Sequence, residues 1–149
     1  MSTPSASVQI RVSFADVDSS QRIHFTAMFR YFEVAEHELM RRIGLPYATS
    51  LSEVAMPRVH LSCDFKGAVR YDDQLVVVAK VEKVGRSSWT DAFTAYRLTG
   101  EEGWFPASQA VVATGHMTIV TMDPASERAV PLPEELRRAL SGGAAEPAE

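Results

Sequence analysis

Apolar and polar residues alternate at the start of the chain, and the pattern becomes helical after a polar loop. Residues 8–14 (VQIRVSF) place an apolar side chain at every second position, which predicts a strand with one face on a core. From Phe25 to Ile43, apolar residues recur at intervals of three and four, which predicts a helix with one buried stripe. Residues 16–21 lie between them and are rich in Asp and Ser, so we expect a loop there.

The predicted helix has clear start and stop signals. Thr26 is suited to cap its N-terminus. Two arginines lie in its last turn, Gly44 follows where a C-terminal cap is expected, and Pro46 cannot continue a helix. Charged residues on a helix usually face solvent, and we expect this of Glu36 and Glu38, whereas we expect Glu33 to be structural or interfacial. This is the longest helix that the sequence predicts.

Four β-rich stretches follow the helix, and glycines between the later ones favour antiparallel hairpins. They are residues 59–65, 75–84, 88–98 and 107–122. Gly115 inside the last stretch indicates a bulge or a close approach by a group packed on the sheet. Residues 133–140 predict a short helix with proline at its first position, and 142–149 predict a disordered tail.

The order of elements predicts an α+β domain over residues 1–141, in which a five-stranded antiparallel sheet wraps around one long helix. Such a sheet has an open edge strand and an uncovered outer face, and proteins usually pair or hide such edges. We therefore expect a homodimer, or a dimer of two such dimers.

Composition and charge argue against several classes of function and location. The 149 residues carry a net charge of -4 with the basic residues spread along the chain, which argues against a nucleic-acid partner. A single cysteine, Cys63, forms no internal disulfide and no zinc site, and we expect no metal. The start of the chain lacks a secretory signal, and the longest apolar run, Leu75 to Ala79, is far shorter than the ~20 residues that span a bilayer. We expect a cytoplasmic protein with no membrane segment.

Several short motifs occur in a characteristic order. They are 14–25 (FADVDSSQRIHF), 31–33 (YFE), 63–65 (CDF), 70–75 (RYDDQL), 85–89 (GRSSW) and 131–133 (PLP). In this order the chain resembles the 4-hydroxybenzoyl-CoA thioesterase branch of the hot-dog-fold acyl-CoA thioesterases. The resemblance implies a hot-dog fold and hydrolysis of an acyl-CoA or acyl-carrier thioester, with coenzyme A as part of the substrate and no other cofactor.

The resemblance implies that Asp18 is the catalytic carboxylate and that the backbone N–H of Phe25 forms the oxyanion hole. Physical chemistry supports this assignment, because a loop that leads into a helix brings a carboxylate close to free N–H groups and the positive end of the helix dipole. Asp18 would attack the thioester carbonyl or activate a water, and the sequence does not decide between these routes. We expect Asp16 to be structural.

The chain departs from the family pattern at two positions. Many members have glycine where Gln21 stands and asparagine where Ala27 stands. His24 is a further candidate for orienting water or contacting the acyl group, although a histidine beside an aromatic helix start is more often a packing residue. The coenzyme A phosphates require positive charge, and the resemblance places Arg86 and Ser88 near the nucleotide. Three further cations are candidates, Arg58, Lys66 and Arg70.

Two other functions are also consistent with the sequence. One is a hot-dog hydratase or dehydratase, in which His24 and a carboxylate move protons on the acyl chain. The other is a module that binds acyl thioesters without turnover. Thiol release from an acyl-CoA separates both from a thioesterase.

Overall fold

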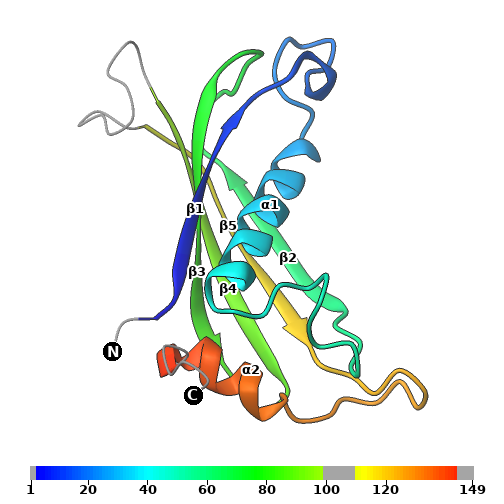
Figure 1. Cartoon of the computed structure of the whole chain (residues 1–149). Coiled ribbons are helices and arrows are strands. Elements are labelled where there is room, and N and C mark those ends of the chain that lie inside the picture. Colours follow the sequence, from blue (N-terminus) through cyan, green and yellow to red (C-terminus); the bar gives the residue numbers. More distant parts are fainter. Residues whose placement is uncertain (1–2, 99–109, 144–149) are drawn as a thin grey trace.

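The structure is a computed structural model and describes residues 3–98 and 110–143. Five strands form one antiparallel sheet, and helix α1 (Ala27–Arg42) lies on one face of it (Figure 1). In spatial order the strands are β1 (Ser5–Arg11), β3 (Gln74–Val84), β4 (Ser88–Arg97), β5 (Ala110–Val120) and β2 (Arg58–Phe65). The predicted hot-dog architecture, a five-stranded antiparallel sheet around one long helix, is confirmed.

The first strand differs from its prediction at both ends. β1 begins at Ser5 and ends at Arg11, and Phe14 belongs to a 3-10 turn, η1 (Phe14–Asp16). The ladder with β3 ends where Arg11 pairs with Gln74, so Phe14 has no strand to pair with and is 74% exposed. Alternation in the sequence therefore continues past the point where the partner strand ends.

The core lies between α1 and the concave face of the sheet. The ring of Phe32 from α1 stacks on Phe93 of β4, with centroids 4.6 Å apart and an angle of 8° between the planes. Gly115 lies beneath this pair: a Cβ atom added to it would be 2.6 Å from the Phe32 ring and 2.3 Å from the Ser62 carbonyl oxygen. The register runs through Gly115 without a shift, so the predicted close approach is confirmed and the glycine is not at a bulge.

The ends of α1 agree with the prediction, but one capping contact does not. Gly44 follows the helix with φ 86°, the left-handed conformation that ends many helices. Thr26 occupies the N-cap position, yet its hydroxyl makes no capping bond and pairs with His24 instead, with Oγ1 2.7 Å from Nδ1. The capping role predicted for the Thr26 side chain is therefore wrong.

A short C-terminal segment closes one end of the sheet (Figure 1). Helix α2 (Glu134–Arg138) continues into a π-helical turn over Ala139–Gly143, and Pro133 is its N-cap residue, not its first helical residue. Residues 107–109 and 144–149, which the predicted last strand and tail include, lie outside the described residues. Within 3–98 and 110–143, no helix has the length and apolar character to cross a bilayer.

Candidate active site

The loop between β1 and α1 folds back on itself around Asp18. The Asp18 N–H donates to the Arg22 carbonyl at 2.9 Å, the Gln21 N–H donates to the Asp18 carbonyl at 2.9 Å, and Val17 pairs with Ile23 as an antiparallel bridge. Gln21 has φ 70°, in the left-handed region that favours glycine. The glutamine therefore adopts the backbone conformation for which glycine is suited, and the tight loop closes without glycine.

The Asp18 carboxylate is exposed and accepts hydrogen bonds from one neighbour. Its Oδ1 accepts from the Ser20 N–H at 2.8 Å and from the Ser20 hydroxyl at 2.5 Å. These two bonds, together with the charge of His24, hold the pKa of Asp18 below its ordinary value. Oδ2 accepts no hydrogen bond within the described part of the chain. Asp18 is thus ionised at neutral pH and keeps one oxygen free.

Asp18 opens onto a cavity of about 640 Å³. Phe14 and Tyr71 form part of its lining and contact each other edge to face, with ring centroids 5.6 Å apart. Arg70 lines the same cavity, and its guanidinium makes no ion pair within residues 3–98 and 110–143. The structure thus brings Arg70 close to Asp18. It also adds two aromatic residues that sequence analysis did not select, because the end of the β1–β3 ladder, which leaves Phe14 exposed, is not visible in the sequence.

Phe25 lies on the other side of the Val17–Ile23 bridge. It lines a second cavity of about 360 Å³ together with Ile23, Arg22 and Lys66, whereas Val17 lines the Asp18 cavity. Among the described residues, the backbone N–H of Phe25 has no acceptor. One chain therefore presents a free amide and a free carboxylate oxygen on two adjacent, open cavities and not in one closed pocket.

His24 lies directly before this free amide. Its ring stacks on Phe25 with centroids 4.6 Å apart, and its Nδ1 is paired with the Thr26 hydroxyl. Ala27, where the family often has asparagine, is fully buried as the first residue of α1. The alanine side chain has no polar group, so Ala27 offers a carbonyl no side-chain donor at this helix start.

Asp16 connects the loop to α1. Its carboxylate accepts hydrogen bonds from Arg30 at 2.5 Å and from the Tyr31 hydroxyl at 2.6 Å. Its own carbonyl accepts from the His24 N–H at 2.7 Å. Asp16 therefore fixes the loop on the helix through its carboxylate and its carbonyl.

Arg58, a candidate for binding phosphate, belongs to a buried polar cluster away from this loop. Its guanidinium contacts the carboxylate of Glu36, which also accepts from the Tyr47 hydroxyl at 2.6 Å. Glu36 and Asp91 are both fully buried, so the expected solvent-facing position of Glu36 is wrong. Glu36 follows Phe32 by four residues, which places it on the buried stripe of α1. The Arg58 side chain is thus already paired with Glu36, and we do not propose it as a phosphate-binding residue.

The buried cluster predicts a loss of stability as pH rises from 6 to about 8. Burial and the charge of Glu36 raise the pKa of Asp91 from its ordinary value of 3.8 to about 8. An acid with a raised pKa binds more protons in the folded chain, so the free energy of unfolding decreases as pH rises towards 8, by about 1.4 kcal/mol per unit. We expect urea unfolding midpoints to fall between pH 6 and pH 8 in the wild type and to stay nearly constant in Asp91→Asn.

Tyr47→Phe is the matched control for this titration. It removes a hydrogen bond to Glu36 but no carboxyl group, so it should lower stability by a similar amount at every pH between 6 and 8. Equal pH slopes in the wild type and Asp91→Asn would contradict the assignment.

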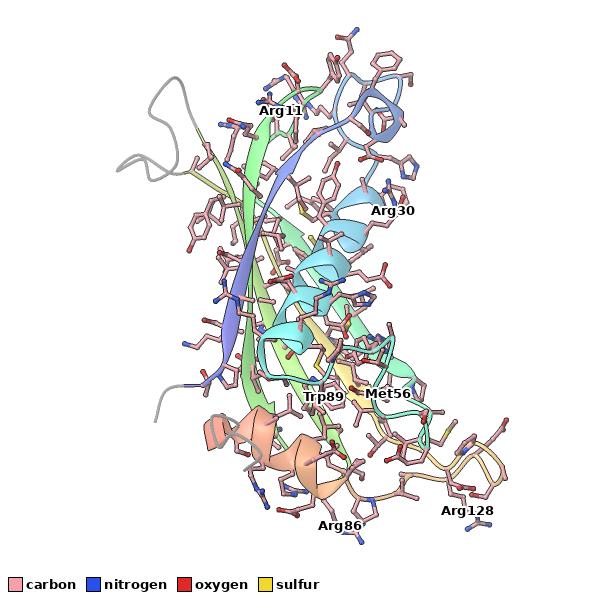
Figure 2. All side chains as sticks on the ribbon, viewed as in Figure 1. Arg11, Arg30, Met56, Arg86, Trp89 and Arg128 are labelled. Atoms are coloured by element: carbon pink, nitrogen blue, oxygen red, sulfur yellow. The ribbon has the colours of Figure 1, made fainter. Side chains whose placement is uncertain are left out.

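Arg86 and Ser88 lie far from Asp18 within one chain. Arg86 lies in the turn between β3 and β4 and Ser88 begins β4, whereas the loop between β1 and α1 lies at the opposite end of the sheet (Figures 1 and 2). Within the described ranges, no three His, Cys, Asp or Glu side chains lie together in a way that could hold a metal ion.

The fold and this loop define a class, the hot-dog proteins with a carboxylate in front of the central helix. The model of the thioesterase superfamily matches residues 21–103, which is more than half of the sequence. The chain therefore belongs to the thioesterase superfamily. The matched segment begins just after Asp18, so the family match itself does not include that carboxylate.

Individual relatives agree with this family. A 1,4-dihydroxy-2-naphthoyl-CoA hydrolase of Synechococcus sp. (strain CC9605) is 27% identical over 146 residues, covering 93% of this chain and 91% of that protein. The structure of 4-hydroxybenzoyl-CoA thioesterase from Pseudomonas sp. strain CBS-3 has a TM-score of 0.79 at 20% identity, covering 91% and 99% of the two chains. A 4-hydroxybenzoyl-CoA thioesterase mutant in complex with 4-hydroxybenzoyl-CoA has a TM-score of 0.80 at 19% identity, covering 93% and 99%.

Proposed function

We propose that this protein is an acyl-CoA thioesterase that hydrolyses its substrate to a free acid and coenzyme A through Asp18. The observation that carries the proposal is an ionised carboxylate with one free oxygen, on the loop before α1, facing a cavity lined by aromatic side chains and Arg70. The curated relative named as a 1,4-dihydroxy-2-naphthoyl-CoA hydrolase aligns over nearly the whole chain and supports the same activity.

Asp18 has two chemically balanced routes to the products. As a nucleophile, its free oxygen attacks the thioester carbonyl, the C–S bond breaks to give the thiolate, and water then hydrolyses the mixed anhydride. As a general base, it takes a proton from a water that attacks the same carbonyl, the C–S bond breaks, and the proton passes to the leaving thiolate. Both routes need an ionised carboxylate at neutral pH, and the lowered pKa of Asp18 meets that need. Neither needs a strong acid, because a thiol leaving group has a pKa of only ~8.5.

The backbone N–H of Phe25 supplies the oxyanion site in this proposal. It lies two residues before α1, has no acceptor among the described residues and belongs to a segment near the positive end of the helix dipole. A fixed N–H donor of this kind stabilises the negative charge that develops on the carbonyl oxygen.

The same contacts support a hydratase or dehydratase function less well than they support thioester hydrolysis. Hydration of an enoyl thioester requires a base that takes a proton from water and a second group that delivers a proton to the α-carbon, and an ionised Asp18 can serve only as the base at neutral pH. His24 uses Nδ1 for the Thr26 hydroxyl, which leaves only Nε2 for any transfer.

We propose that two chains pair through β2. This strand is an edge of the sheet, and Val59, Leu61 and Phe65 on it are exposed large apolar residues. Val34 on α1 is exposed as well. An unpaired edge with apolar side chains favours association with another strand, and a second copy of β2 offers a matching one.

Antiparallel pairing of two β2 strands would also complete the site. Such pairing reverses one subunit relative to the other, so the β3–β4 turn of one chain lies towards the Asp18 loop of its partner. Arg86 would then reach a substrate held by the partner chain. This explains how residues at opposite ends of one sheet could serve one substrate.

A charge on the β2 edge should separate the subunits. We expect Leu61→Lys to give a monomer in sedimentation velocity and to lower kcat/KM at least tenfold, because lysine replaces an apolar contact across the interface. Val111→Lys adds the same charge to an exposed position of β5, an interior strand, and should remain a dimer. A fully active Leu61→Lys monomer would refute the shared site.

Thiol release tests the proposed function directly. The purified protein is incubated with short, branched and aromatic acyl-CoAs, and free thiol is followed with a colorimetric reagent. Release above the spontaneous rate from at least one of these supports the proposal. Hydration of an enoyl-CoA without thiol release, or tight binding with neither product, would replace it with one of the two other readings.

A further inference from the structure

In the turn between β3 and β4, three backbone carbonyls accept hydrogen bonds from residues on one side of the turn. The Nη2 atom of Arg137, from α2, donates to the Gly85 carbonyl at 3.1 Å and to the Arg86 carbonyl at 2.9 Å. The Leu132 N–H also donates to the Arg86 carbonyl, at 2.9 Å. The Thr121 N–H donates to the next carbonyl along, that of Ser87, at 2.9 Å. Three successive carbonyls therefore face the C-terminal segment and the end of β5.

This arrangement fixes where the turn's N–H groups point. In a trans peptide unit the C=O and the following N–H point in opposite directions, and the described residues include no cis peptide bond. The amides of Arg86 and Ser87 belong to the peptide units whose carbonyls converge on the Arg137 guanidinium. Both amides therefore point away from α2, and neither has an acceptor among the described residues.

Hydrogen-bond donors therefore lie on the side of the turn that faces away from α2. Two successive backbone N–H groups and the exposed Arg86 side chain lie on a turn of three residues, 85–87, and Ser88 follows as the first residue of β4. In the part of the chain that the structure describes, Arg86 makes no ion pair. Successive free N–H groups beside a guanidinium are a favourable arrangement for binding a phosphate.

We propose that Arg137 is a positioning residue that holds the β3–β4 turn so that the amides of Arg86 and Ser87, with the Arg86 side chain, bind a phosphate group of coenzyme A. This inference rests on the proposed function for its ligand, and the residues that make it are different from those that perform hydrolysis. Figure 2 shows Arg86 beside α2, the helix that carries Arg137.

Arginine suits this role because one of its nitrogens serves both carbonyls while the rest of the charged group remains close to the turn. Arg138, the next residue, provides a matched control. It pairs with Glu134 at 3.9 Å, and none of its contacts reaches the turn within residues 3–98 and 110–143. Arg137→Met and Arg138→Met remove the same charge from the same helix, and only the first removes the guanidinium bonds to the Gly85 and Arg86 carbonyls.

The test is binding of coenzyme A and of pantetheine, which lacks the nucleotide phosphates, measured by isothermal titration calorimetry. We expect Arg137→Met to raise the Kd for coenzyme A about tenfold and to change the Kd for pantetheine less than twofold, since charge-assisted contacts of this kind are lost only for the phosphate ligand. The KM for an acyl-CoA should rise in the same proportion, and the KM for the matching acyl-pantetheine should not. Arg138→Met should leave coenzyme A affinity within twofold of the wild type.

Three results would overturn the inference: equal losses in Arg137→Met and Arg138→Met, equal losses for coenzyme A and pantetheine, or no loss at all. If Arg137→Met does not fold, amide chemical shifts of the wild type decide instead, because those of Arg86 and Ser87 must move when coenzyme A is added and must not move with pantetheine. Calorimetry requires no turnover. A coenzyme A site that depends on Arg137 in a protein that releases no thiol would therefore reject the proposed hydrolysis and leave the phosphate site in place.

Discussion

Asp18→Asn is expected to lower kcat for acyl-CoA hydrolysis at least a hundredfold, which corresponds to about 2.7 kcal/mol of transition-state stabilisation. Asparagine has nearly the same shape and its side-chain oxygen can still accept the bonds from Ser20, so the loop should keep its path. What it lacks is the negative charge that either attacks the carbonyl or takes a proton from water. Substrate binding should change little, because the contacts with the acyl group and the phosphates remain. Steady-state thiol release, with KM and kcat determined separately, measures the effect.

Asp123 offers a matched control for this experiment. Its carboxylate also accepts a serine N–H in a turn, that of Ser126 at 2.8 Å, and this bond likewise lowers its pKa. It follows β5, at the other end of the sheet from the Asp18 loop. Asp123→Asn therefore removes a carboxylate of the same local chemistry and should retain kcat within twofold. A hundredfold loss in both variants would indicate damage to folding, and retention of activity by Asp18→Asn would remove Asp18 from the mechanism.

Much of the fold is predictable because it depends on local periodicity. The helix and the middle strands repeat apolar residues at their own intervals, and α1 begins and ends within a few residues of its predicted bounds. Phe14 shows where this method fails. Its alternation with Val12 and Ile10 is that of a strand, but whether a strand continues depends on a partner that is distant in sequence, and β3 pairs no further than Gln74.

The site is predictable only as far as its chemistry is local. Asp18 and Phe25 stand in one short segment, so the sequence motif brings both to attention. The buried contact of Glu36 with Arg58 joins α1 to β2 and carries no periodic signal beyond the spacing of Glu36 from Phe32. The role of Arg137 is still harder to predict from the sequence. Arg137 binds backbone carbonyls about fifty positions away, and every residue type has a backbone carbonyl, so no motif marks the contact. Contacts between segments far apart in sequence therefore come from the structure alone.

Gly115→Ala is expected to destabilise the folded protein by about 3 kcal/mol, more than most single additions of a methyl group. The added Cβ would be 2.3 Å from the Ser62 carbonyl oxygen on β2 and 2.6 Å from the ring of Phe32. The first contact is with the backbone of the neighbouring strand, and the second is with a ring held against Phe93. Neither group can rotate away cheaply, so β2 or α1 must shift. Urea unfolding followed by circular dichroism measures the change.

Two further variants distinguish this steric clash from the general effect of replacing a glycine with alanine. In Gly67→Ala the shortest contact of the new Cβ is with Cγ1 of Val112, at 3.3 Å, and the nearest backbone atoms, in Val112 and Val111, are at 3.7 and 3.8 Å, so the cost should be less than 1 kcal/mol. Phe32→Leu combined with Gly115→Ala should destabilise by less than the sum of the two single changes, because the smaller side chain relieves one of the two clashes. Full additivity, or a Gly67→Ala cost equal to that of Gly115→Ala, would show that close packing of α1 on the sheet is not what requires glycine at position 115. Since Phe32 lies on the same helix whose start carries the Phe25 amide, any shift of α1 in Gly115→Ala should also lower kcat.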